Sequence, residues 1–448
     1  MRPVRIKMQT VAWAGCLITF IYLVTSFTIH KASQTSLERL RDGKERKSLA
    51  MANKEFLLKA NVDEVDENSK SGNNEVNEVE EIINDAEDTN IELPKSKESF
   101  EVVKETVKSE RKLVKQPVRH IAFLKVHKTA SSTAQNVFLR YGDERNLSFV
   151  LAHTKGESGW LNVISYENSI TESNIVPAPR GQPFDLLCCH VIYNRKAFES
   201  VLPRDTVYIG IVREPISRFQ SAIKYFSPRF ILKLPGNNPL SIYAKNPLEH
   251  EPQNPRQSQT NNRMAVEFGF PEELFPGKAL NGSQKDIDAY IKKLDGEFDF
   301  IIISEMFDES MVLMKQRLGW ETKDVLYVDK NVGGKITNTK KILHEEDHDN
   351  IRKFLYLDIA VYNLAMERFN TLVEEGGEEF ENELQEFKAE RIKITQFCNS
   401  SKASSIFIKA TEFHNDYSVT KNDCKTFAKH EKDLIQKQRH RMYGTLDN

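Results

Sequence analysis

Four short apolar runs, each followed by a polar turn or a helical pattern, constrain the fold of this chain more than any other feature. The runs lie at residues 120–126, 184–192, 206–212 and 299–304. Strands that are apolar on both faces and alternate with helices are typical of a parallel sheet. The helical patterns include one that Pro215 initiates and one over 307–318. The sequence therefore predicts an α/β fold whose central, mostly parallel sheet is flanked by helices.

Two longer stretches complete the body of the chain. Residues 351–373 carry apolar side chains at helical spacing and predict one or two C-terminal helices. Residues 226–267 are rich in Pro, Asn and Gln. Such a composition predicts a long surface insertion, which would be suited to binding a substrate.

The N-terminus contains an uncharged apolar run of 19 residues at 11–29. As a helix this run would be about 28 Å long, close to the roughly 30 Å of a bilayer's hydrocarbon core. A cleaved signal peptide is the alternative, but its apolar region is usually shorter, about 7–15 residues. We therefore predict a cytosolic tail at 1–10 and an uncleaved transmembrane signal anchor at 11–29.

Charge does not decide the orientation of this anchor, because basic residues flank it on both sides. Glycosylation sequons are more informative, and three follow the anchor, at Asn146, Asn281 and Asn399. Together with a leader too short to fold, they favour a lumenal position for the C-terminal body.

Residues 30–115 read as a disordered, acidic stem between the anchor and a folded body at 116–448. Residues 61–100 hold 13 Asp or Glu and 3 Lys, and the whole stretch has few aromatic residues. Such a segment cannot bury enough apolar surface to offset its chain entropy.

The charges of the whole chain nearly balance, with 63 Lys or Arg against 65 Asp or Glu. This balance argues against a nucleic-acid-binding protein, which would carry a large basic excess. Outside 61–100 the chain has 60 basic and 52 acidic residues. A mildly basic body of this kind suits an anionic ligand.

Apart from Cys16 in the anchor, the body holds four cysteines: Cys188, Cys189, Cys398 and Cys424. A lumenal body would form one or two disulfides, for which three complete pairings exist. Cys398 with Cys424 is the first candidate, and free buried thiols are the alternative. No Cys-x-x-Cys or His-x₃-His spacing indicates a zinc site.

The first candidate anion site is the turn after the first apolar run, which reads KVHKTASST from Lys125 to Thr133. A helix N-terminus offers unpaired N–H groups and a partial positive charge. With Lys128 and several hydroxyls added, such a turn would cradle a phosphate. It is not a Walker P-loop, since it has no glycine. An ordinary Ser/Thr-rich helix cap is the alternative.

Two further candidates follow the other strands. Arg213 stands at the end of the 206–212 run, and Ser221 follows two helical turns later. Ligands of doubly wound sheets bind at the carboxyl ends of strands, so these residues could hold a second phosphate. His190 ends the segment FDLLCCH (184–190) within the 184–192 run and could act as a general base. A surface arginine and a structural histidine are the alternatives.

At these motifs the chain resembles the galactose 3-O-sulfotransferases, a family of Golgi enzymes that includes galactosylceramide sulfotransferase. The resemblance rests on the segments FLKVHKTASST at 123–133, VYIGIVREP at 207–215, FQS at 219–221 and DFIIISEMFDES at 299–310. It implies a P-loop-like sulfotransferase fold, the sulfonate donor 3′-phosphoadenosine 5′-phosphosulfate (PAPS), and a type II Golgi membrane protein whose lumenal sulfotransferase domain is 116–448. It also implies a galactose-terminated glycolipid or glycan as acceptor.

The resemblance further implies roles for single residues. Lys128 would contact the bridging oxygen and the sulfonyl group. His190 matches the base of the related uronyl 2-O-sulfotransferases. The other implied nucleotide contacts are Thr129, Ser131, Ser132 and Thr133 at the 5′-phosphate and Arg213 and Ser221 at the 3′-phosphate, with Lys125 and Ala130 as further nucleotide-binding residues. Glu267 stands where the galactose family more often has Asp.

The expected reaction is in-line sulfonyl transfer without a metal, with His190 taking the proton and Lys128 stabilising the leaving phosphate. Sulfation of another sugar hydroxyl, as in a uronic acid, remains an alternative. A kinase-like enzyme is disfavoured by the missing glycines and Mg²⁺ carboxylates. The third alternative is an inactive, glycan-binding Golgi protein.

Overall fold

The computed structural model describes residues 116–153, 160–278, 283–328 and 343–444. The predicted tail, anchor and stem at 1–10, 11–29 and 30–115 lie outside this part of the chain and stay predictions. Among the described residues, no helix combines the length and the apolar character that crossing a membrane requires.

A sheet of five parallel strands forms the centre of the fold, in the order β2-β3-β1-β4-β5. The strands are β1 (Ile121–Phe123), β2 (Phe149–Val150), β3 (Leu186–Leu187), β4 (Val207–Val212) and β5 (Phe300–Ile303). Four of them lie inside the four predicted runs, which confirms the α/β class and the parallel sheet. The two-residue strand β2 was not predicted, because so short a strand leaves no pattern in the sequence.

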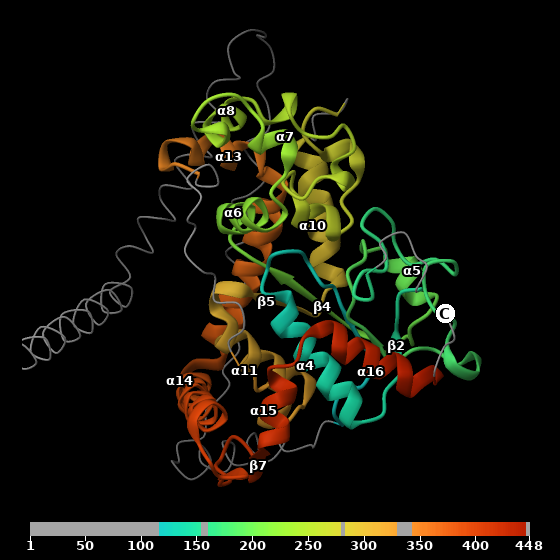
Figure 1. Cartoon of the computed structure of the whole chain (residues 1–448), viewed down its shortest axis with the longest axis vertical. Coiled ribbons are helices and arrows are strands. Elements are labelled where there is room, and N and C mark those ends of the chain that lie inside the picture. The colour runs from blue at the N-terminus through green and yellow to red at the C-terminus, as the bar shows by residue number, and fades with distance from the viewer. Residues whose placement is uncertain (1–115, 154–159, 279–282, 329–342, 445–448) are drawn as a thin grey trace, which may run out of the picture. The chain divides into compact units, whose positions relative to one another are not determined.

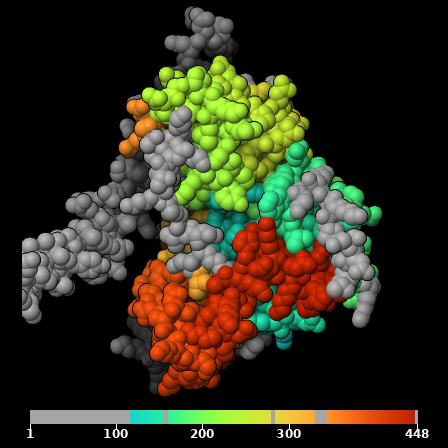
Figure 2. All heavy atoms as spheres, in the orientation of Figure 1, coloured from blue at the N-terminus to red at the C-terminus, as the bar shows by residue number. Residues whose placement is uncertain are grey.

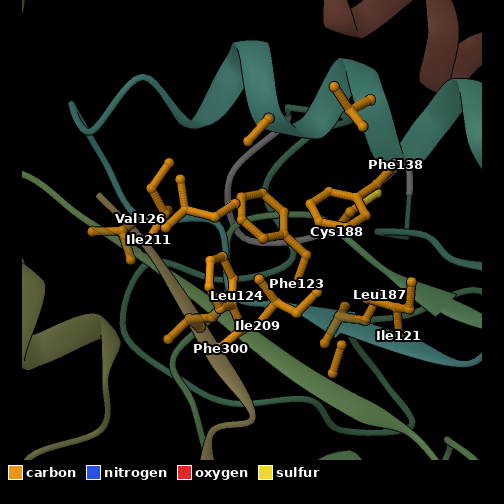
Figure 3. Packing of buried hydrophobic residues seen from close by; sticks show 14 of the residues in the cluster. Ile121, Phe123, Leu124, Val126, Phe138, Leu187, Cys188, Ile209, Ile211 and Phe300 are labelled. Atoms are coloured by element: carbon orange, nitrogen blue, oxygen red, sulfur yellow. The ribbon is translucent and has the colours of Figure 1, made fainter. Parts of the chain in front are cut away.

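Helix α4 (Ser131–Glu144) packs against the sheet and closes the main apolar core (Figure 3). Phe123 of β1 and Phe138 of α4 stack with their ring centroids 4.6 Å apart. Gly142 permits this close approach, since a Cβ there would lie 2.4 Å from Phe149 and 2.5 Å from Leu186. The turn before α4 is thereby fixed above the end of β1.

Several further helices lie around the sheet or against the helices that cover it (Figure 1). They are α6 (Pro215–Phe226), α10 (Gln284–Glu297), α11 (Phe307–Leu318), α13 (His348–Phe354) and α14 (Tyr356–Ser400). The predicted helices that start at Pro215 and span 307–318 are confirmed. Helix α14 packs on α11 and β5 and runs well past the predicted end at residue 373. It is interrupted at Gly377, whose φ of 52° suits a glycine.

The prediction of a long surface insertion at 226–267 is wrong. This segment folds into α7 (Arg229–Leu232), α8 (Pro239–Lys245) and α9 (Arg263–Glu267), with 3₁₀ turns between them. Ile231, Leu240 and Tyr243 are fully buried in a second apolar core with α6 and α13. Asn238 caps α8 and Pro239 begins it, so the Pro and Asn content that suggested a loop marks helix starts instead. The segment covers part of the face shown in Figure 2, in yellow-green.

The C-terminal region adds a hairpin and two helices. They are β6 (Ser405–Ile408), β7 (Tyr417–Thr420), α15 (Lys421–Phe427) and α16 (Glu431–Tyr443). A disulfide joins Cys398 at the end of α14 to Cys424 of α15, which confirms the first candidate pairing. Cys188 and Cys189 are free, buried thiols.

The disulfide should contribute strongly to stability, because it closes a loop with a sequence separation of 26 residues. We expect Cys398→Ser to lower the free energy of unfolding by roughly 3 kcal/mol, measured by denaturant titration. Cys398→Ser combined with Cys424→Ser should be no less stable than either single variant. An unchanged unfolding midpoint in Cys398→Ser would show that the disulfide does not stabilise the fold.

Two of the three predicted sequons can be placed. Asn146 and Asn399 are exposed, whereas Asn281 lies outside the described residues. The side-chain oxygen of Asn146 accepts a hydrogen bond from Arg441 at 2.5 Å. Glycosylation at all three positions stays a prediction.

Candidate functional site

The strand order brings the predicted site residues to one edge of the sheet. β1 lies between β3 and β4, and the chain changes direction across the sheet at the β1–β4 pair. In parallel α/β sheets such a switch point, at the carboxyl ends of the strands, is where ligands bind. Lys128 follows β1, His190 follows β3 and Arg213 follows β4.

The turn between β1 and α4 has the backbone of an anion cradle. Lys128 has a φ of 67° and Ala130 a φ of 59°, both in the left-handed region. Left-handed residues in such a turn point successive N–H groups to the same side, which is the geometry of an anion-binding nest. No side chain caps α4. Instead, the hydroxyls of Thr129 and Ser131 both donate to the Val126 carbonyl, at 3.0 and 2.5 Å.

These two hydroxyl contacts change how the turn could hold a phosphate. A hydroxyl that donates to Val126 cannot donate to a ligand at the same time. The exposed Ala130 and Ser132 and the partly exposed Thr133 lie at the start of α4. The backbone of this turn, rather than the Thr129 and Ser131 side chains, is therefore the better candidate for phosphate contacts.

Two cations meet at this turn. Arg213 donates from Nη1 to the Lys128 carbonyl at 3.3 Å, and its Nε lies 3.8 Å from Glu305. Ser304, just after β5, donates to the Thr129 carbonyl and fixes the other side of the turn. Burial lowers the pKa of Lys128, and the neighbouring charges of Arg213 and Lys224 lower it further. An anion placed here would relieve this repulsion.

Lys125 lies beneath the turn and is fully buried. Its ammonium donates to Ser132 at 3.2 Å and to Glu431 at 2.9 Å. Glu431, the first residue of α16, also accepts from Asn162 at 2.6 Å. Burial opposes ionisation of Glu431, but the Lys125 charge and the hydrogen bonds hold its pKa below the ordinary value. Lys125 thus ties the C-terminal helix to the turn, and a nucleotide contact from it stays a prediction.

His190 contacts the residues that precede the same turn, and one hydrogen bond fixes the orientation of its ring. Its Nδ1 lies 2.8 Å from the Lys125 carbonyl, which can only accept, so Nδ1 carries the hydrogen and Nε2 is the free acceptor. The ring stacks on His127, with centroids 3.6 Å apart. Burial, followed by the His127 and Lys125 charges, holds the pKa of His190 well below its ordinary value. His190 is therefore a neutral imidazole at neutral pH, able to take a proton.

Glu267 lies beside the two stacked imidazoles. We call His127, His190 and Glu267 together the histidine pair with Glu267. The Glu267 carboxylate accepts from the His127 backbone N–H at 2.7 Å and from the His127 ring, and Arg263 lies 3.4 Å away. It also lies 3.7 Å from Nδ1 of His190. Burial opposes ionisation of Glu267, but His127 and Arg263 outweigh it and lower the pKa. A negative charge is thus fixed beside both imidazoles.

The roles of His127 and Glu267 escaped the sequence analysis. His127 lies inside the lysine-containing turn, and Glu267 is 140 residues away at the end of α9, so no local pattern connects them. The ligand atoms of His127, His190 and Glu267 lie within 4.8 Å of one another and could also hold a metal ion. The prediction that the reaction needs no metal therefore stays a prediction.

Ser221 is not connected to the other predicted site residues by a hydrogen bond within the described part of the chain. It lies in the second turn of α6, partly exposed. Among the described residues, no hydrogen bond joins its side chain to Arg213 or to the turn after β1. Its predicted contact with the 3′-phosphate stays a prediction.

Aromatic side chains surround the histidine pair and the turn. Tyr225 is 69% exposed, and the Lys128 ammonium lies 3.8 Å from its ring centroid. The rings of Tyr166 and Phe226 have their centroids 5.5 and 6.0 Å from that of His127. An exposed aromatic ring beside a cation is suited to stacking against a sugar or a base.

Comparison with known proteins finds similarity to one family of sulfotransferases. The family model for Galactose-3-O-sulfotransferase matches residues 92–415. The chain is 29% identical to human galactosylceramide sulfotransferase over 219 residues, which are 48% of this chain and 49% of the relative. It is 32% identical to mouse galactose-3-O-sulfotransferase 3 over 47% of each chain. It is 30% identical to mouse galactose-3-O-sulfotransferase 2 over 56% of this chain and 62% of the relative. The matched part thus spans about half to three fifths of the length of these relatives.

Proposed function

Since the chain belongs to the galactose-3-O-sulfotransferase family, we propose that it transfers the sulfonyl group of PAPS to the 3-hydroxyl of a terminal β-galactose. The acceptor would be a glycolipid or a glycoprotein glycan. We further propose that residues 11–29 anchor the protein in the Golgi membrane, with the domain from residue 116 in the lumen.

One observation carries this proposal: two cations and a group of proton acceptors meet at the carboxyl ends of three neighbouring strands. Lys128 and Arg213 follow β1 and β4, and His190 follows β3. A sulfotransferase needs positive charge for its anionic nucleotide and a base for the acceptor hydroxyl. The residues at this edge of the sheet fit both needs.

The turn after β1 and Arg213 are the residues that would hold PAPS. When bound, PAPS supplies the sulfonyl group and a phosphate leaving group. The left-handed turn and Lys128 present donors and a positive charge where negative charge develops on the departing phosphate. Arg213 offers a planar fork of donors, which suits the 3′-phosphate.

His190 would take the proton of the galactose hydroxyl as the hydroxyl oxygen bonds to sulfur and the bond from sulfur to the phosphate oxygen breaks. The proton goes to Nε2, because Nδ1 is engaged with the Lys125 carbonyl. Glu267 would stabilise the positive charge that results on the stacked imidazoles. His127, with Glu267 on its ring nitrogen, would support this charge as a positioning residue.

The exposed ring of Tyr225 supports a neutral sugar as the acceptor. Galactose has an apolar face that packs on aromatic rings, whereas a polyuronate would call for clustered cations. Tyr225 and Phe226 lie in the last turn of α6, the helix that also carries Ser221. Sulfation of a uronic acid or a glycan-binding role without turnover are the competing functions.

Loss of the guanidinium at position 213 should weaken nucleotide binding. We expect Arg213→Ala to raise the Kd for 3′-phosphoadenosine 5′-phosphate about 10- to 100-fold, because a charge-assisted hydrogen bond is worth about 1.5–3 kcal/mol. Calorimetry on the purified full chain measures this. Arg229→Ala, which removes an exposed arginine from α7, is the matched control. Equal affinity in Arg213→Ala and Arg229→Ala would remove Arg213 from the nucleotide site.

The function itself is tested by incubating the full chain with sulfonate-labelled PAPS and a panel of β-galactosides, α-galactosides and uronic acid saccharides. The proposal expects label on β-galactosides, at O3 by linkage analysis. Label on uronic acids alone would favour the first competing function. Nucleotide binding without any transfer would favour the second.

A further inference from the structure

A second group of metal-ligating side chains lies away from the strand ends, where α14 meets the loop between β6 and β7. Glu386 and Glu390 are one helical turn apart on α14, and His414 comes from the loop. Their ligand atoms all lie within 4.8 Å of one another. We propose that these three residues bind a divalent transition-metal ion such as Zn²⁺.

The orientation of His414 supports a ligand at its second ring nitrogen. Nδ1 lies 2.7 Å from the Asn415 carbonyl, so Nδ1 carries the hydrogen. Metal-binding histidines usually donate their other ring N–H to a carbonyl or carboxylate in this way. Nε2 then faces Glu390 at 2.9 Å and Glu386 at 3.0 Å. The His414 side chain is only 2% exposed, so this nitrogen points into the protein.

Each carboxylate is also held in place by a neighbour. Tyr417 donates to Glu390 at 2.9 Å, and Thr411 donates to Glu386 at 2.6 Å. The Tyr417 contact involves Oε2 of Glu390 and leaves its Oε1 facing the imidazole. Thr411 donates to Oε1 of Glu386, the same oxygen that faces His414. The three ligands are thus oriented by groups outside the set, as in known metal sites.

A small cavity provides the space for the ion. It has a volume of about 10 Å³ and is lined by His414, Glu386, Glu390 and Glu383, with Phe387 and Phe413 among its other walls. A volume near this size accommodates about one water-sized particle. A single ion could therefore enter with only small adjustments of the side chains around it.

The local charge favours a divalent cation. Glu383 forms an ion pair with Lys315, so these two charges cancel. A histidine that coordinates a metal ion through Nε2 brings no charge of its own, so Glu386 and Glu390 would bring a charge of about −2, which a divalent ion would neutralise. One imidazole and two carboxylates match the mixed nitrogen and oxygen ligands of Zn²⁺, with the fourth position left to water. The ion would fasten the β6–β7 loop to α14, on the helix that also carries Cys398 of the disulfide.

The test uses the purified full chain after removal of metals by a chelator. Calorimetry with Zn²⁺ should give one ion per chain, and Co²⁺ should produce the strong visible absorption of a four-coordinate site. Glu390→Gln should weaken Zn²⁺ binding by at least roughly tenfold and abolish the increase in melting temperature that Zn²⁺ causes. Glu381→Gln, an exposed residue of the same helix, should leave both unchanged.

Glu267→Gln separates this site from the histidine pair with Glu267. Retained Zn²⁺ binding in Glu267→Gln together with loss in Glu390→Gln supports the site on α14. The opposite pattern, or no stoichiometric binding by the unmodified chain, would overturn it. In the latter case His414 only connects the β6–β7 loop to α14 through its contacts with Glu386 and Glu390. Neither result depends on sulfotransferase activity.

Discussion

Lys128→Ala should lower kcat for sulfonyl transfer by on the order of 10²–10³, because it removes a positive charge from the place where the leaving phosphate gains negative charge. The left-handed backbone of the turn and the buried contacts of Lys125 do not depend on the Lys128 side chain. The fold should therefore survive. Steady-state kinetics with PAPS and a β-galactoside measure the effect, and circular dichroism checks the fold.

Lys196→Ala is the matched control, since Lys196 is an exposed lysine on α5 (Arg195–Glu199). It should retain the activity of the unmodified chain within about twofold, as expected for a surface position. If Lys128→Ala were as active as Lys196→Ala, the turn after β1 would not stabilise the leaving group. The proposed mechanism would then be wrong at its central electrostatic contact.

His190→Ala should lower kcat by about 10²–10⁴, the usual contribution of a general base. Binding of 3′-phosphoadenosine 5′-phosphate should remain within a few-fold, because the proposed nucleotide contacts come from the turn after β1 and from Arg213 rather than from His190. A variant that lost nucleotide binding or unfolded would instead identify His190 as a structural residue. Kinetics and calorimetry on the same preparation separate these outcomes.

The pH dependence offers a second readout for this base. The rate should rise with pH as His190 loses its proton, and the acid limb of kcat/KM should lie below pH 6.5, because burial lowers the pKa of His190 well below that value. Glu267→Gln removes the carboxylate that raises the pKa of His127, so any part of the limb due to His127 should move to lower pH. An acid limb above pH 6.5 would contradict the assignment.

Local patterns in the sequence were enough to locate the main chemical groups. Lys128, His190 and Arg213 each follow an apolar strand within a few residues, and a parallel sheet brings the ends of its strands together. The start of α6 at Pro215 and the whole of α11 were predicted for the same reason, since periodicity and proline act over short distances.

Partners that lie far apart in the chain could not be predicted. Glu431 reaches Lys125 across 306 residues, and Glu267 reaches His127 across 140. A carboxylate is common on surfaces, and only the three-dimensional fold shows that Glu267 is buried, and Glu431 partly buried, beside cationic side chains. The prediction for the segment 226–267 was wrong for a different reason. Pro and Asn begin short helices as readily as they form loops.

The central claim is that the turn after β1 and Arg213 hold the two ends of one nucleotide. A crystal structure of the protein with 3′-phosphoadenosine 5′-phosphate tests it most directly. We expect the 5′-phosphate against the backbone of residues 128–132 and the Lys128 ammonium, and the 3′-phosphate against Arg213. A nucleotide bound elsewhere, with neither cation in contact with a phosphate, would contradict the account.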